Sequence, residues 1–158
     1  MNPPHLAQLL VALTAERDAL RNFVDLLERE QSLMVANQTD QLLELAEQKS
    51  ANAISLSELA ESRRSLLRQG IPELAIASIH AWLEKHSAQA LTIWQEIRVL
   101  AEHAQQLNRT SGELIQMKLR HNQQALSVLG KAVNKASLYG PDGQTSFSPG
   151  SGRSLGSG

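Results

Sequence analysis

The chain has 158 residues, of which 42% are hydrophobic and only 3% aromatic, and its net charge is −1. This length suits one domain with a moderate core, and the near-neutral charge offers no basic field for nucleic acid or for an anionic membrane. The chain has no cysteine, which excludes disulfides, thiolate nucleophiles and thiolate metal sites and fits a reducing cytoplasm.

The hydrophobic residues are mostly leucine and alanine, and this composition favours helices over sheet. The first twenty residues lack the basic start of a signal peptide and pass quickly into charged residues. No stretch approaches the roughly 20 apolar residues that cross a bilayer. We therefore expect a soluble, cytoplasmic protein without membrane insertion.

The first predicted helix begins after two prolines and ends near Ala36. Its apolar stripe recurs in steps of three and four and is interrupted at Glu16. The stripe consists of Leu6, Leu9, Leu13, Leu20, Val24, Leu27 and Met34. A polar turn follows at 37–40, in which Thr39 or Asp40 is the expected N-cap of the next helix.

A second helix is predicted over about 40–68, with a heptad seam on one face. The seam consists of Leu42, Leu45, Lys49, Asn52, Leu56, Leu59, Arg63 and Leu66. Long basic side chains can extend from a seam toward water, so the pattern predicts an antiparallel hairpin with the first helix. Gly70 suits the position after the helix end, and Pro72 suits the first position of a new helix.

A short third helix is expected over about 72–85, and Ser87 is the expected cap of a fourth. Within the fourth helix, a capping-box pattern at Thr110 and Glu113 and the flexibility of Gly112 favour a break. The stripe stays in phase through this junction, however, and no proline interrupts it. We therefore predict one continuous helix of about 49 residues, near 70 Å long.

The fourth helix is longer than the first, so the hairpin cannot cover all of its apolar edge. An uncovered apolar strip usually marks a partner site, and self-association into a dimer or tetramer is the alternative. The overall prediction is an all-α fold: an elongated antiparallel helical hairpin or bundle with one long C-terminal helix. Its helical domain spans 1–137, and a flexible, glycine-rich tail spans 138–158.

The sequence offers little for catalysis. The five histidines are scattered, no metal-binding helix motif occurs, and no glycine-rich loop follows a strand. We therefore expect no enzyme, no metal site and no cofactor. Trp82, Trp94 and Phe23 adjoin apolar stripes and are expected in the core, whereas Tyr139 stands in the tail, where an aromatic side chain is a suitable anchor for another protein.

The C-terminal third resembles the FlgN flagellar export chaperones. The resemblance rests on "LNRTSGELIQMKLRHNQQALSVLGKA" and on "LYGPDGQTS", which span about 107–146. Two positions depart from the family pattern: Ser111-Gly112 stands where Asn-Gly is usual, and His121 replaces an arginine.

The resemblance implies a cytosolic helical protein that binds the C-terminal helical segments of the two hook-filament junction proteins, the FlgK and FlgL types. Such a chaperone keeps these hook-associated proteins from assembling early and delivers them to the flagellar type III export gate. The resemblance further implies that Tyr139 docks on a component of this gate.

The apolar strip of the fourth helix is the expected binding site for the client, which would lay an amphipathic helix against it. The predicted site residues are Leu114, Ile115, Met117, Leu119, Asn122, Leu126, Leu129 and Val133. Gln123 and Gln124 are expected to add polar contacts at its edge. The competing hypothesis is a structural coiled-coil adaptor that self-assembles through the same stripe.

Overall fold

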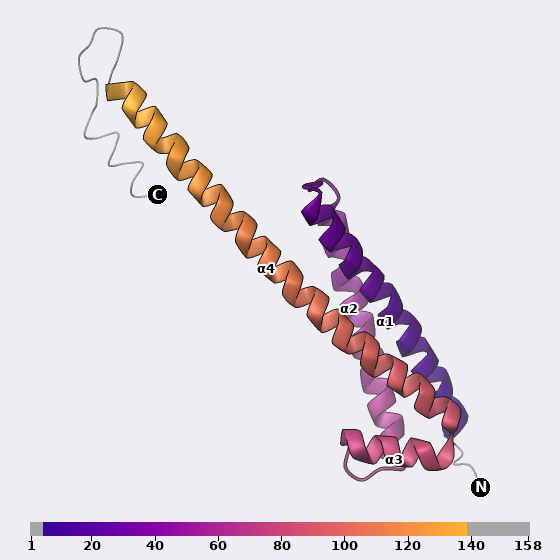
Figure 1. Ribbon diagram of the computed structural model, residues 1–158. Helices are drawn as coiled ribbons and strands as arrows, with labels where there is room; N and C mark the ends of the chain where they lie inside the picture. Colours follow the sequence, from indigo (N-terminus) through magenta and orange to yellow (C-terminus); the bar gives the residue numbers. More distant parts are fainter. Residues whose placement is uncertain (1–4, 139–158) are drawn as a thin grey trace. The chain divides into compact units, whose positions relative to one another are not determined.

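The computed structural model describes residues 5–138, and within that range the side chains of residues 5–132. This part of the chain consists of four α-helices and contains no strand, which confirms the all-α prediction (Figure 1). The helices are α1 (Leu6–Val35), α2 (Leu42–Arg68), α3 (Ile76–His86) and α4 (Ala88–Leu138).

The chain divides into two units between Glu113 and Leu114. The first unit contains α1, α2, α3 and the first half of α4, and the second contains the rest of α4. The helix is continuous through Gly112, as the in-phase stripe predicted. The tail boundary predicted at 138 stays a prediction, because residues 139–158 lie outside the described part of the chain.

Helices α1 and α2 form the predicted antiparallel hairpin (Figure 1). Every residue of the predicted α1 stripe is buried, from Leu6 to Met34. The two basic side chains in the seam of α2, Lys49 and Arg63, form salt bridges with carboxylates of α1 and do not extend into water. Lys49 Nζ lies 2.9 Å from an oxygen of Glu30, and Arg63 Nε lies 2.8 Å from Glu16 Oε1.

In the turn between α1 and α2, backbone hydrogen bonds end the first helix and begin the second. Asn37 has a left-handed backbone with φ 57°, and the Gln38 and Asn37 amides donate hydrogen bonds to the Leu33 and Met34 carbonyls at 2.9 and 3.2 Å. This pattern is a Schellman motif, in which asparagine takes the position that glycine usually occupies. The predicted N-cap of α2 is wrong: Gln41 holds that position without a side-chain hydrogen bond, and Thr39 contributes only its backbone carbonyl, which accepts from the Leu42 amide.

Helix α3 begins four residues later than predicted. Its N-cap is Ala75, whose backbone is extended at φ −128° and ψ 158°. Pro72 therefore does not start the helix. In the linking segment, packing of Ile71 and Leu74 on the core outweighs the helix-starting preference of proline.

Gly70 directly follows the C-cap of α2, as predicted, but its role is close packing. A Cβ at this position would lie 2.9 Å from three atoms of the Trp82 ring. The predicted cap of α4 is confirmed, because the Ala90 amide donates a hydrogen bond to Ser87 Oγ at 3.1 Å.

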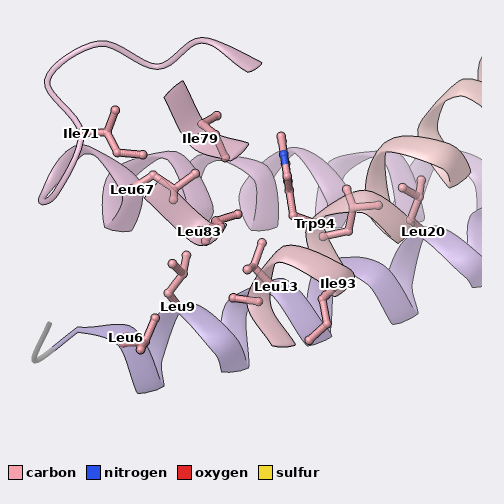
Figure 2. Close-up of a cluster of buried hydrophobic side chains, with 12 residues drawn as sticks. Leu6, Leu9, Leu13, Leu20, Leu67, Ile71, Ile79, Leu83, Ile93 and Trp94 are labelled. Atoms are coloured by element: carbon pink, nitrogen blue, oxygen red, sulfur yellow. The ribbon is translucent and has the colours of Figure 1, made fainter. Parts of the chain in front are cut away.

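The main core of the first unit joins all of its helices (Figure 2). Leu9 and Leu13 of α1, Leu67 of α2 and Leu83 of α3 are fully buried. Trp94 of α4 is buried beside them, and Trp82 and Phe23 are partly buried against the core, as expected for aromatic anchors. None of the described helices is both long and apolar enough to span a membrane.

Candidate functional site

Large apolar side chains lie exposed on the part of α4 that belongs to the second unit. They are Ile115, Met117, Leu119, Leu126, Val128 and Leu129. In the first half of the same helix, by contrast, Ile93 and Ile97 are buried in the core. Burying a side chain of this size is worth about 1.5–3 kcal/mol, so a cluster of exposed ones favours a binding surface.

One set of these residues forms a narrow stripe. Successive steps of three or four residues place them on one side of the helix. We call this stripe the leucine face; it consists of Ile115, Leu119, Asn122, Leu126 and Leu129. Leu126 is its most exposed apolar member, with 68% of its surface accessible. The structure therefore places five of the predicted site residues together.

A second set surrounds a shallow groove of about 490 Å³. We call it the groove face; its lining is His121, Gln124, Ala125, Val128, Leu129 and Ala132. The predicted site residues Leu114 and Met117 continue this side of the helix toward its N-terminus, since they precede His121 by seven and four residues. Leu114 is half-buried and Met117 is exposed.

Val128 is the residue that the sequence analysis missed. It is 67% exposed and lines the groove. The stripe predicted from the sequence contains Leu126 and Leu129, and Val128 lies about 100° away from Leu129 around the helix. The sequence does contain a signal for Val128. It follows His121 by seven residues and Met117 by eleven, and these spacings place all three side chains on one side of a helix.

Two predicted site residues lie beyond what the structure describes. Val133 belongs to α4, but its side chain is outside the described residues, and Tyr139 is outside them altogether. Their roles therefore stay predictions.

The charged residues in this part of α4 are all basic. From Leu114 to Leu138 the sequence has no aspartate or glutamate, but it has four lysine or arginine residues. Arg120 and Lys131 are exposed, and each lies within one helical turn of a residue that lines the groove. One border of the groove, on the side of Gln124, therefore carries positive charge.

The groups with clear pKa shifts belong to ion pairs of the first unit. Hydrogen bonds from Arg68 and Arg64 lower the pKa of Glu61. Desolvation opposes the charge of Arg17, but hydrogen bonds to Asp18 and Glu96 raise its pKa overall. Such surface pairing is ordinary and does not prepare a group for proton transfer. Among the described residues, no cluster of three histidine or acidic residues has the arrangement of a metal site.

Comparison with known proteins places this helical chain in a family. A family model described as FlgN protein matches residues 1–146. The flagella synthesis protein FlgN of Salmonella typhimurium (strain LT2) is 31% identical over 150 residues, which cover 95% of this chain and 96% of that protein. The chain belongs to the FlgN family.

Other FlgN proteins align over nearly the same range. The flagella synthesis protein FlgN of Escherichia coli (strain K12) is 31% identical over 144 residues, covering 89% of this chain and 90% of that protein. The protein of the same name from Yersinia enterocolitica is 28% identical over 151 residues, covering 94% and 97%. No solved structure matches the chain.

The FlgN match confirms the resemblance and extends it from about 107–146 to nearly the whole chain. Its relatives are named for the synthesis of flagella and not for a chemical reaction. The family model includes both exposed faces and also Tyr139, while it ends one residue before Phe147.

Proposed function

We propose that this FlgN-family chain is a cytoplasmic chaperone of flagellum biogenesis. It binds the C-terminal helical segments of the hook-filament junction proteins, of the FlgK and FlgL types, and prevents their premature assembly. It then delivers them to the flagellar type III export gate. The observation that carries the proposal is the leucine face, a row of exposed apolar side chains on a helix of a chain whose relatives serve flagella synthesis.

The leucine face has the pattern that an amphipathic helix of a client requires. Ile115, Leu119 and Leu126 present apolar groups along one side, and Asn122 among them offers a polar contact. A client helix would cover this row with its own apolar face. Binding of an amphipathic helix to such a row uses few anchor residues, and the spacing of these anchors gives specificity.

The leucine face supplies part of the binding energy that a chaperone needs. Burial of three or four such side chains gives about 5–10 kcal/mol before the costs of association are subtracted. A dissociation constant of about 1 μM requires about 8 kcal/mol after these costs, so client contacts outside the leucine face must supply the rest. A chaperone of about micromolar affinity holds its client in the cell and can still release it to export machinery that supplies the energy.

Tyr139 is the residue to which we assign the delivery step. It directly follows α4 in the sequence and lies within the family match, in the "YGPDGQT" segment. We assign to it the docking on the export gate. An aromatic side chain is well suited to this role, since tyrosine anchors are enriched at the centres of protein interfaces.

The substitution Leu126→Asp tests the client site. It replaces a 68% exposed leucine by a charge, so the chain keeps its fold and its helicity by circular dichroism. Binding of the junction proteins from the same bacterium is expected to weaken by about 30-fold or more, because one apolar contact of about 2 kcal/mol is lost and a charge would be desolvated. Isothermal titration calorimetry measures the change.

The matched control is Ser127→Asp. It adds the same charge at the neighbouring exposed position, on the side of the helix away from both faces. Its binding of the junction proteins is expected to stay within about twofold of the unaltered protein. Equal binding by the Leu126→Asp and unaltered proteins would place the client elsewhere and refute the proposed site.

A further inference from the structure

The groove face has the geometry of a socket for helix packing. In knobs-into-holes packing, one side chain enters a hole formed by four residues of the facing helix. Such a hole has the spacing i, i+3, i+4 and i+7, which every face of a helix offers, so its depth depends on the residues at these positions. The groove contains two consecutive sets with this spacing, and they share two members. The sets are His121, Gln124, Ala125, Val128 and Ala125, Val128, Leu129, Ala132.

The small residues explain why the groove is hollow. Ala125 and Ala132 are exposed and end at Cβ, while Val128 and Leu129 rise between them. A large apolar side chain of a partner helix, such as leucine, fits the space above each alanine. Two such side chains, one heptad apart or less, would cover Val128 at the same time.

The groove face and the leucine face are separate binding surfaces. Apart from Leu129, which borders both, the two sets of residues point in directions about 130° apart around the helix axis. A single straight partner helix cannot cover both. An occupant of the groove must therefore be a helical segment separate from the one that lies on the leucine face.

Charge identifies the chemistry of this second segment. Arg120 and Lys131 lie along one border of the groove, are exposed, and have no ion-pair partner among the described residues. The stretch from Leu114 to Leu138 has no acidic residue to pair with the same stretch of another copy. Self-pairing through this surface would bring like charges together. An acidic partner helix would instead pair with both cations.

We propose that the groove face binds a second helical segment of the client, which is amphipathic and acidic. Its large apolar side chains enter the two holes around Ala125, and its acidic side chains at the flanking positions reach Arg120 and Lys131. The inference deepens the proposed function and rests on it for the identity of the client. The chemistry of the groove, however, is tested without the client.

The test uses two labelled synthetic peptides of about three heptads, with leucine at the seam positions and either glutamate or lysine at all flanking positions. The protein is the full chain with Leu126→Asp, so that binding on the leucine face is suppressed. The glutamate peptide is expected to bind about tenfold or more tightly than the lysine peptide in fluorescence anisotropy at low salt. Reversing both cations, with Arg120→Glu and Lys131→Glu, is expected to invert this preference.

Two further variants separate the groove from general charge effects. Ala125→Leu fills both holes while keeping a good helix former, so binding of the glutamate peptide is expected to fall about tenfold. Ala101→Leu makes the same change at an exposed position of the first unit and leaves binding unchanged. Lys85→Glu with Arg98→Glu is the charge-matched control for the double reversal and also leaves the preference unchanged.

The outcomes distinguish this inference from the proposed function. Equal binding of the two peptides, binding of neither, or an Ala125→Leu protein that binds like the Ala101→Leu control would overturn the groove proposal. Those results would leave the effect of Leu126→Asp on the junction proteins untouched. Assembly of the unaltered protein into a stable dimer that Ala125→Leu dissociates would likewise overturn it, in favour of a second copy as the occupant.

Discussion

At the scale of single residues, the first unit contains a buried ion pair with an aromatic neighbour. Glu16 of α1 is only 5% exposed, although it is charged and stands in the apolar stripe. Arg63 of α2 donates a hydrogen bond to it, and the Arg63 guanidinium carbon lies 4.8 Å from the centre of the Trp94 ring. One arginine thus joins α1, α2 and α4 through a salt bridge and a cation–π contact.

We predict that Glu16→Gln destabilises the protein by about 2–4 kcal/mol, because it leaves the Arg63 charge buried without its anion. Urea unfolding followed by circular dichroism measures the loss. The double variant Glu16→Leu with Arg63→Met is expected to recover most of it, since an apolar pair of similar volume removes both desolvation costs. A Glu16→Gln protein as stable as the unaltered one would show that Arg63 gains nothing from the carboxylate.

At the scale of elements, the two halves of α4 differ in how they are supported. The first half buries Ile93, Trp94 and Ile97 in the core. From Ile115 to Ala132 almost every side chain is exposed. A helix without tertiary burial of an apolar face depends on local propensity alone, which is marginal at this length in water. We therefore expect local opening of residues 115–132 at a lower free energy than opening of 90–107.

Gly130→Ala tests this expectation. A Cβ at Gly130 meets nothing within 4 Å, so the change acts through helix propensity and is worth about 0.5–1 kcal/mol. Amide hydrogen exchange in residues 115–132 is expected to be faster than in 90–107 and to slow about two- to fivefold in the variant. Exchange that is equally slow in both halves of the unaltered protein would contradict the prediction.

The elements also show what periodicity in the sequence can predict. Local spacing located seven of the nine buried residues of α1 and the continuity of α4 through Gly112, because both depend on residues three or four positions apart. The burial of Glu16 depends on Arg63, which is 47 positions away in the sequence. The contact between Gly70 and Trp82 is likewise tertiary. No local pattern contains such partners.

In the candidate site, too, the sequence predicted what depends on regular spacing and missed the rest. The leucine face follows one helical stripe, so the sequence predicted its members from their spacing. The groove depends on a hollow above Ala125 and Ala132 beside the exposed Val128. Small residues carry little weight in a stripe of large apolar ones, and Val128 lies on a different side of the helix. The signal that could have found it is the two alanines three and four positions from Val128 on the same side of the helix.

At the scale of the whole molecule, the near-neutral charge conceals an asymmetry. From Leu114 onward the sequence has five basic residues and one acidic residue, so this part carries +4 while residues 1–113 carry −5. The unit with the exposed apolar faces is therefore cationic, and the hairpin unit is anionic. A client with acidic helices is attracted to the first and repelled by the second, which favours binding in one register.

Removal of the C-terminal segment separates the holding of a client from its delivery. Removing residues 139–158 deletes Tyr139 but keeps α4, which ends at Leu138, together with both of its exposed faces. Binding of the junction proteins is therefore expected to stay within about twofold, whereas their secretion into the medium falls strongly. Tyr139→Ala alone is expected to reproduce the secretion defect, because the aromatic anchor supplies most of the docking energy.

Phe147→Ala is the matched control, since it removes the other aromatic residue of the same segment one position beyond the family match. Normal secretion by the Tyr139→Ala protein, or an equal defect with Phe147→Ala, would refute the docking role of the tyrosine. A loss of client binding on truncation would instead show that the segment belongs to the client site. Holding and delivery would then be functions of one surface and not of two.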